Sequence, residues 1–224
     1  FFKLKHSVTL NSIQKLKGKE KRNIYKKLEA IVIDEISMVR ADLLDCVDRF
    51  LRLNGKNPSL PFGGVQMIFI GDLYQLPPVI TSQEKDVFEA HYKSPYFFSA
   101  RFFENYEMVF IELDQIFRQQ DNNFIRLLNA IRNETMTEED MRLLNQRVKP
   151  DFESEGYIYL TPKNKDADAI NTARLNALKG KSFTAEAQVE GNFGQEYYPT
   201  RQTLAFKESA QIMMVNNDSN GEWV

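Results

Sequence analysis

The sequence predicts an α/β protein with mainly parallel sheets flanked by helices. Two short apolar runs, AIVI at 30–33 and VQMIFI at 65–70, are typical of strands that are covered on both faces. Between and beyond these runs, apolar residues recur at the spacing of amphipathic helices. Strands that alternate with helices along the whole chain favour parallel sheets, because the chain crosses over through a helix between parallel strands.

Helical spacing predicts four helices, at about 39–51, 124–131, 138–148 and 166–178. The first ends near Asn54-Gly55, and Gly180 ends the last. Thr137 and Asp140 resemble a capping box that opens the third helix.

Two further strands are predicted at MVFIEL (108–113) and YIYL (157–160). The LYQLPPV stretch (73–79) is predicted to be a loop that leaves the second strand, because paired prolines fit neither a helix nor a central strand. The phenylalanines at 97, 98, 102 and 103 and the single cysteine, Cys46, are predicted to be core residues rather than functional ones.

Composition excludes several classes of protein. The 224 residues contain one cysteine and two histidines, which excludes a disulfide framework and leaves no zinc site to propose. No apolar run approaches about 18 residues, so we expect a soluble, cytoplasmic protein without a membrane partner, associated with the nucleoid if the source is bacterial.

The charge is segregated along the chain although the net charge is −2. Residues 1–28 hold nine basic side chains and one acid. The basic run 15–27 has two readings that the sequence leaves open: a solvated surface, or a patch that faces a polyanion.

Polar side chains follow the first two strands at the edge where ligands bind in parallel α/β sheets. Asp34 and Glu35 come directly after the first strand, and residues 72–75 follow the second. An adjacent acid pair suits nucleoside triphosphate hydrolysis, with one carboxylate orienting Mg²⁺ and the next accepting a proton from the attacking water. The alternative is a strand end that merely reaches solvent.

Two more residues are candidates for contact with phosphate. The amide of Gln75 lies three residues beyond an acid, in a path that the prolines stiffen, where it is suited to contact a γ-phosphate or the attacking water. Arg118 lies between a predicted strand and a predicted helix, and its guanidinium is suited to reach a phosphate. The alternatives are an exposed glutamine in a proline-rich turn and a surface arginine.

Several motifs together resemble the PIF-type DNA helicases, relatives of the RecD helicases in superfamily one. In chain order they are FF, DEISM, GDLYQLPPV, IFRQQD with FIRLLNAIR, YLTPKN and LAFKESAQIMMVNND followed by EWV. The resemblance covers nearly all of the chain. The acid pair alone is a weak signal, but GDxxQLPPV after DEISM and before FRQ is a specific combination.

The resemblance implies an ATP-driven 5′-to-3′ translocase that unwinds DNA, with ATP and Mg²⁺ as cofactors and roles in DNA repair, recombination and telomere maintenance. It implies two RecA-like (P-loop NTPase) domains, both incomplete. The first covers 1–115, with a basic wedge-like insertion at about 7–27. The second covers 116–224 and ends at the start of a further inserted subdomain.

The resemblance also assigns roles. Asp34 is expected to hold Mg²⁺, Glu35 to act as catalytic base, and Gln75 to sense the γ-phosphate. Arg118 is expected to enter from the second domain to stabilise transition-state charge.

For nucleic acid, the resemblance implies single-stranded and forked DNA as partners of a monomeric protein. Lys19 and Lys21 in the basic run, and Thr161 and Asn164 in TPKN, are the candidate DNA contacts. For Asn164, capping of the following helix is an equally good alternative.

The phosphate-binding signature GxxxxGK[ST] does not occur in the sequence. We therefore expect an internal piece of a helicase that is inactive alone. Two alternatives remain: a non-catalytic RecA-like module that binds nucleic acid or protein, and another P-loop ATPase motor. The LPPV and FRQ segments argue against the second alternative.

Overall fold

The computed structural model describes residues 9–82, 84–153, 155–189, 198 and 200–215, and the side chains of residues 19–22 lie outside this description. The chain divides into two compact units, Phe1–Arg147 and Val148–Val224. The predicted domain boundary at 115/116 falls inside the first unit and stays a prediction.

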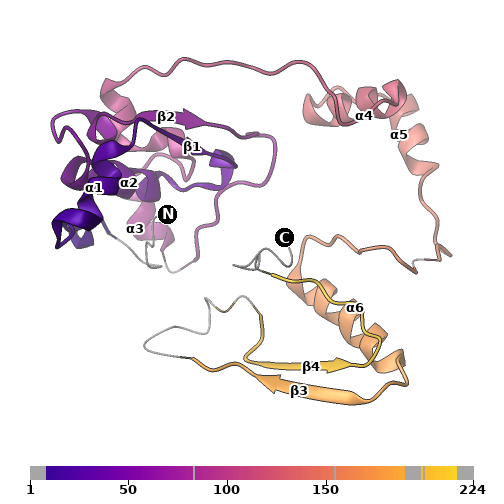
Figure 1. Cartoon of the computed structure of the whole chain (residues 1–224). Coiled ribbons are helices and arrows are strands. Elements are labelled where there is room, and N and C mark those ends of the chain that lie inside the picture. The colour runs from indigo at the N-terminus through magenta and orange to yellow at the C-terminus, as the bar shows by residue number, and fades with distance from the viewer. Residues whose placement is uncertain (1–8, 83, 154, 190–197, 199, 216–224) are drawn as a thin grey trace. The chain divides into compact units, whose positions relative to one another are not determined.

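The first unit is built on a β-α-β arrangement (Figure 1). Strand β1 (Ala30–Ile33) pairs in parallel with strand β2 (Gln66–Phe69), in a register that places Ala30 opposite Gln66. Helix α2 (Ala41–Asn54) lies between the two strands in sequence. Both predicted strands and the helix that ends at Asn54 are confirmed.

The core lies between α2 and one face of this sheet. Its buried members are Ile36, Ala41, Leu44, Val47, Leu51, Phe62, Phe88, Phe97 and Ala100. Ile31 and Phe69 pack against the core, whereas Val32 and Ile68, which face the other way, are 57% and 40% exposed. The expectation that strand AIVI is covered on both faces is therefore wrong for the described residues. The described helices cover only the face of the sheet that carries Ile31 and Phe69.

Three of the four phenylalanines belong to this core, as predicted: Phe97 is buried, and Phe102 and Phe103 pack against it. For Phe98 the prediction is wrong, because its side chain is 45% exposed. Two short 3₁₀ helices, η4 (Phe97–Ser99) and η5 (Arg101–Asn105), carry these rings. Phe102 packs edge-on against Phe62, with ring centres 4.7 Å apart.

Cys46 is also a core residue, as predicted. It is buried on α2, and this burial raises the pKa of its thiol to about 11.

A buried carboxylate fastens the segment after α3 (Lys85–Glu89) to α2. Asp45 accepts hydrogen bonds from the Tyr92 hydroxyl at 2.9 Å and from the Arg101 backbone N–H at 3.2 Å. Burial raises the pKa of the Asp45 carboxyl, and these donors oppose the rise. The network places residues 92–101 against α2.

The N-terminal part of the described chain is fastened to the other end of α2. The 3₁₀ helix η1 (Leu10–Ser12) precedes α1 (Lys19–Lys27). The buried amide of Asn54 accepts the Leu16 N–H at 2.8 Å, and Tyr25 packs edge-on against Phe50.

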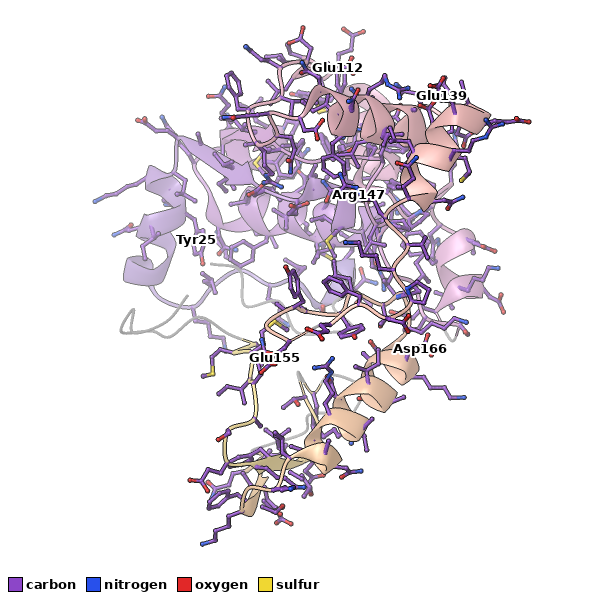
Figure 2. The ribbon with its side chains drawn as sticks, turned by 90° about the vertical axis from the view of Figure 1, so that its right-hand side faces the viewer. Tyr25, Glu112, Glu139, Arg147, Glu155 and Asp166 are labelled. Atoms are coloured by element: carbon purple, nitrogen blue, oxygen red, sulfur yellow. The ribbon has the colours of Figure 1, made fainter. Side chains whose placement is uncertain are left out.

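Two predicted strands are absent from the described residues. Residues 108–113 and 157–160 are irregular, and Val109 and Leu160 are 88% and 94% exposed. Glu112, labelled in Figure 2, lies on the first of these stretches. A strand needs a partner ladder, and among the described residues only β1 with β2 and β3 with β4 form one. Apolar composition alone was therefore an insufficient signal.

The predicted helices after Arg118 are confirmed. Helix α4 (Asn122–Arg132) begins at Asp121, whose carboxylate accepts two backbone N–H groups of the first turn. Helix α5 (Glu138–Asn145), which carries Glu139 in Figure 2, opens with the predicted capping box between Thr137 and Asp140. Arg126 of α4 forms an ion pair with Asp140, which joins the two helices.

The second unit contains helix α6 (Asn164–Ala177), as predicted, and a hairpin that the sequence analysis did not predict. Strands β3 (Ser182–Glu186) and β4 (Thr203–Lys207) pair antiparallel, with Phe183 stacked on Phe206. The Lys207 ammonium donates to the Leu178 carbonyl at 2.8 Å, just beyond the end of α6. The chain is thus α/β as predicted, and its described part contains one parallel and one antiparallel strand pair. None of the described helices is both long and apolar enough to span a bilayer.

Candidate nucleotide site

The loops that follow β1 and β2 are held together at the carboxyl ends of the strands. The Ile70 N–H donates to the Ile33 carbonyl, and the Ile36 N–H donates back to the Ile70 carbonyl, each at 2.9 Å. Gly71 approaches the first loop so closely that an added Cβ would lie 2.9 Å from Cγ2 of Ile36. Asp34 and Glu35, which lie between Ile33 and Ile36, therefore share one edge of the sheet with the loop that begins at Gly71.

The backbone changes direction at the acid pair. Glu35 has the left-handed conformation, with φ 53° and ψ 41°, which is uncommon for a residue other than glycine. Its N–H donates to Oδ1 of Asp34 at 2.9 Å. The left-handed residue ends the alternation of side chains along the strand, and both carboxylates are exposed to solvent. This turn explains how neighbouring acids come to lie at a single edge.

Asp72 organises the second loop. Its Oδ1 accepts the Tyr74 N–H at 3.0 Å, and its carbonyl accepts the Gln75 N–H at 3.1 Å. The Gln75 side chain also donates from Nε2 to Oδ2 of Asp72, at 3.4 Å. Backbone and side-chain contacts therefore place Gln75 close to Asp72, at the edge that carries the acid pair.

Sequence reasoning missed Arg132 in this arrangement. Arg132 is the last residue of α4, and its guanidinium donates to Oδ2 of Asp72 at 2.8 Å. The two residues are 60 positions apart, so no local pattern marks the pair. Asp72 itself could be recognised in the sequence, as the acid three residues before Gln75.

Arg118 is not brought to this edge by any contact of the described residues. It lies in the irregular stretch between η5 and α4 and is exposed. No hydrogen bond or ion pair links its guanidinium to another described side chain. Its assignment to the nucleotide site stays a prediction.

The candidate DNA contacts are distributed over both units. Thr161 donates its hydroxyl to the Lys163 carbonyl at 3.0 Å, and Asn164 is the first residue of α6. The N-cap of α6 is Lys163, so the alternative that Asn164 caps this helix is wrong. Lys19 and Lys21 belong to α1, but their side chains lie outside the described residues.

The carboxylates present at the edge fit a magnesium ion that a nucleotide helps to hold. The described residues contain no cluster of three or more histidine, cysteine, aspartate or glutamate side chains that would bind a metal ion alone. Asp34 has one oxygen engaged by the Glu35 N–H. Mg²⁺ commonly takes one or two carboxylates and completes its shell with waters and substrate phosphates, which matches a single exposed carboxylate here.

A hollow on the surface lies elsewhere in the first unit. It is lined by residues of α4 and α5, among them Arg126, Asn129 and Asp140, and by none of the predicted site residues. This hollow therefore does not coincide with the sheet edge that carries the candidate nucleotide site.

The chain is similar to known proteins in both sequence and structure. The family model described as PIF1-like helicase matches residues 1–142. The ATP-dependent DNA helicase RRM3 of Saccharomyces cerevisiae is 31% identical over 211 residues, which are 89% of this chain and 28% of that protein. The chain therefore spans less than a third of this curated relative.

Two solved structures of Bacteroides Pif1 are also similar. The one bound to single-stranded DNA is 33% identical with a TM-score of 0.79, over 94% of this chain and 49% of that one. The one in complex with ADP-AlF3 and single-stranded DNA is 33% identical with a TM-score of 0.75, over the same shares of the two chains. The match of the family model over more than half of the sequence, together with the two joined loops at the sheet edge, leads to one conclusion: the chain belongs to the PIF1-like helicase family.

Proposed function

We propose that the protein containing this chain is an ATP-dependent DNA helicase that moves 5′ to 3′ on single-stranded DNA. The observation that carries the proposal is the hydrogen-bonded contact between the loop with Asp34 and Glu35 and the loop with Gln75. The names of the relatives, ATP-dependent DNA helicases, and the DNA-bound and ADP-AlF3-bound structures support it.

Each residue at the edge has one task in ATP hydrolysis. Asp34 would hold Mg²⁺, and the ion would supply positive charge that neutralises the phosphate oxygens. Glu35 accepts a proton from the water that attacks the γ-phosphorus, while the bond to the bridging oxygen breaks and ADP leaves. Gln75 contacts the attacking water or the γ-phosphate. The exposed position of both carboxylates leaves them accessible to a nucleotide.

Arg118 supplies positive charge to the transferred phosphoryl group. Its side chain is exposed and extends from an irregular stretch, which leaves it free to reach a nucleotide. In other phosphoryl-transfer enzymes such an arginine is worth about 10³ to 10⁵ in rate. Replacement of Arg118 by alanine is therefore expected to cost more turnover than replacement by lysine, which keeps the charge.

Single-stranded and forked DNA are the proposed nucleic-acid partners of a monomeric protein. Lys19, Lys21, Thr161 and Asn164 are proposed to contact the DNA backbone. Contacts through lysine make binding depend steeply on salt. A flat salt dependence would contradict a role for the basic run.

The test uses the complete gene product with forked duplexes. ATP hydrolysis should rise on addition of single-stranded DNA, and duplexes with a 5′ single-stranded tail should be unwound in preference to those with a 3′ tail. Unwinding only from the 3′ tail would overturn the polarity. DNA binding without any ATP hydrolysis would overturn the helicase and support the alternative, a non-catalytic RecA-like binding module.

The 224 residues alone are expected to be inactive, because they lack the GxxxxGK[ST] loop that cradles phosphates. Titration with a fluorescent ATP analogue should show no tight binding to this piece. DNA-stimulated ATP hydrolysis by the piece would contradict the expectation.

A further inference from the structure

Arg132, at the end of α4, reaches the loop after β2 by two separate contacts. Its guanidinium pairs with the Asp72 carboxylate at 2.8 Å, and it lies 5.3 Å from the centre of the Tyr74 ring. The same loop carries Gln75, whose backbone and side chain are both bonded to Asp72. Arg132 therefore contacts Asp72, which is bonded to Gln75, and Tyr74, which precedes Gln75 in the chain.

The contacts of Asp72 determine which end of the Gln75 amide faces it. An ionised carboxylate only accepts hydrogen bonds, so the amide must turn its NH₂ group toward Oδ2 of Asp72, 3.4 Å away. The carbonyl oxygen of the amide is then left without this partner, and the Gln75 side chain is exposed. An oxygen in this position can accept a hydrogen bond from a water molecule.

The Asp72 carboxylate is itself held by two further donors. The Tyr74 N–H binds Oδ1 at 3.0 Å, and Arg132 binds Oδ2 at 2.8 Å, closer than the Gln75 amide. Removing Arg132 would leave Oδ2 of Asp72 with only the longer contact to the Gln75 amide, and it would remove the cation from the face of Tyr74. Asp72 would then rotate with fewer constraints, and Gln75 would follow it.

We propose that Arg132 is a positioning residue for ATP hydrolysis: through Asp72 and Tyr74 it fixes the Gln75 amide with its oxygen toward the attacking water. This inference rests on the proposed function. It also gives α4, which follows the Arg118 stretch, a direct link to the loop that contacts the γ-phosphate. A movement of α4 that breaks the pair would release the amide.

A positioning role is distinguishable from a role in folding. The Arg132 and Asp72 side chains are 46% and 25% exposed, and ion pairs this exposed contribute little to stability. Loss of Arg132 should therefore appear in turnover rather than in thermal stability.

The experiment compares Arg132→Ala with Arg142→Ala in the complete gene product. Arg142 is a matched control, because it also lies on an exposed helix surface and pairs with one carboxylate, that of Glu138. Arg132→Ala should lower kcat for DNA-stimulated ATP hydrolysis by about tenfold, with KM for ATP and Tm unchanged. Arg142→Ala should leave all three unchanged.

Two further variants separate the pathway through Asp72 from a simple loss of charge. Arg132→Lys keeps the charge but loses the planar group over Tyr74, so its kcat should fall between the wild-type and alanine values. Asp72→Asn lets the Gln75 amide bind through either end, so combining it with Arg132→Ala should lower kcat no further than the larger single effect.

The outcomes are distinguishable. If the wild-type protein hydrolyses ATP in response to DNA and Arg132→Ala matches Arg142→Ala, or if the Asp72 and Arg132 effects multiply, the inference is overturned and the proposed function stands. If the wild-type protein shows no such hydrolysis, both fail. A raised KM with unchanged kcat would assign Arg132 to ATP binding and would also overturn the inference.

Discussion

The backbone N–H of Ile36 donates to the carbonyl of Ile70 at 2.9 Å, beyond the last paired residues of β1 and β2. This bond extends the contact between the two segments that follow β1 and β2 past the end of the sheet. The loop that carries Glu35 and the loop that begins at Gly71 consequently behave as one structural element. A change that separates them should alter both.

Replacement of Gly71 by alanine tests this coupling. The new Cβ would lie 2.9 Å from Cγ2 of Ile36 and 3.1 Å from the backbone nitrogen of Ser37, so one loop must shift. We expect a cost of about 1 to 3 kcal/mol. Hydrogen exchange should then be faster at the Ile36 and Ile70 amides. Ser59→Ala, at an exposed position, is the control, and equal exchange in the two variants would refute the coupling.

Glu35→Gln tests the assignment of the catalytic base. The amide keeps the size of the side chain but cannot take a proton from water, so kcat for ATP hydrolysis in the complete gene product should fall by about 10² to 10⁴. Nucleotide affinity should be retained, since Asp34 is intact. Glu104→Gln, an exposed change away from the site, should behave as wild type. Retained turnover in Glu35→Gln would remove Glu35 from the role of base.

Asp140 makes the docking of α5 on α4 depend on pH. Hydrogen bonds from Thr137, and then the charge and hydrogen bond of Arg126, hold the pKa of the Asp140 carboxyl below its usual value. The folded chain therefore binds this proton more weakly than the unfolded chain. The stabilisation is fully present above the unfolded pKa of about 4, and it is lost as pH falls through the lower folded pKa.

The measurement is hydrogen exchange of peptides from α4 and α5, corrected for the intrinsic effect of pH on exchange. Asp140→Asn should reduce protection at neutral pH, and its difference from wild type should vanish in acid. Glu138→Gln, at a side chain that is 92% exposed, should have little effect at any pH. A difference between wild type and Asp140→Asn that does not change with pH would show that the charge is irrelevant.

Cys46 should be unreactive in the folded protein. The rise of its thiol pKa from 9.0 to about 11 lowers the thiolate fraction by about 100-fold at neutral pH, and the side chain is buried. A thiol reagent at pH 8, followed by peptide mass spectrometry, should label Cys46 only after denaturation. Rapid labelling of Cys46 in the native protein would contradict the burial.

Local signals in the sequence predicted much of the first unit. Strands 30–33 and 65–70, the helix that ends at Asn54 and the capping box at Thr137 each depend on residues that are close in sequence. The joint position of Asp34 and Gln75 followed from the rule that parallel strands end at one edge. The left-handed turn at Glu35 was not predicted, because no glycine or asparagine marks it.

Features that depend on distant partners were not predictable in this way. Residues 108–113 have the composition of a strand, but they pair with no described strand. The β3 and β4 hairpin joins segments about 20 residues apart and was missed. Arg132 was missed because Asp72 lies 60 positions earlier.

The conformation of Glu35 has a consequence for laboratory evolution. Glycine adopts a φ of 53° without the steric cost that a side chain incurs, so it would gain about 0.5 to 1 kcal/mol at this position. Selection for a protein that stays folded after heating should therefore enrich glycine at position 35. Selection for cells that need the ATP hydrolysis activity of the protein should remove glycine from this position. The residue found at position 35 after selection would therefore show whether stability or activity was selected.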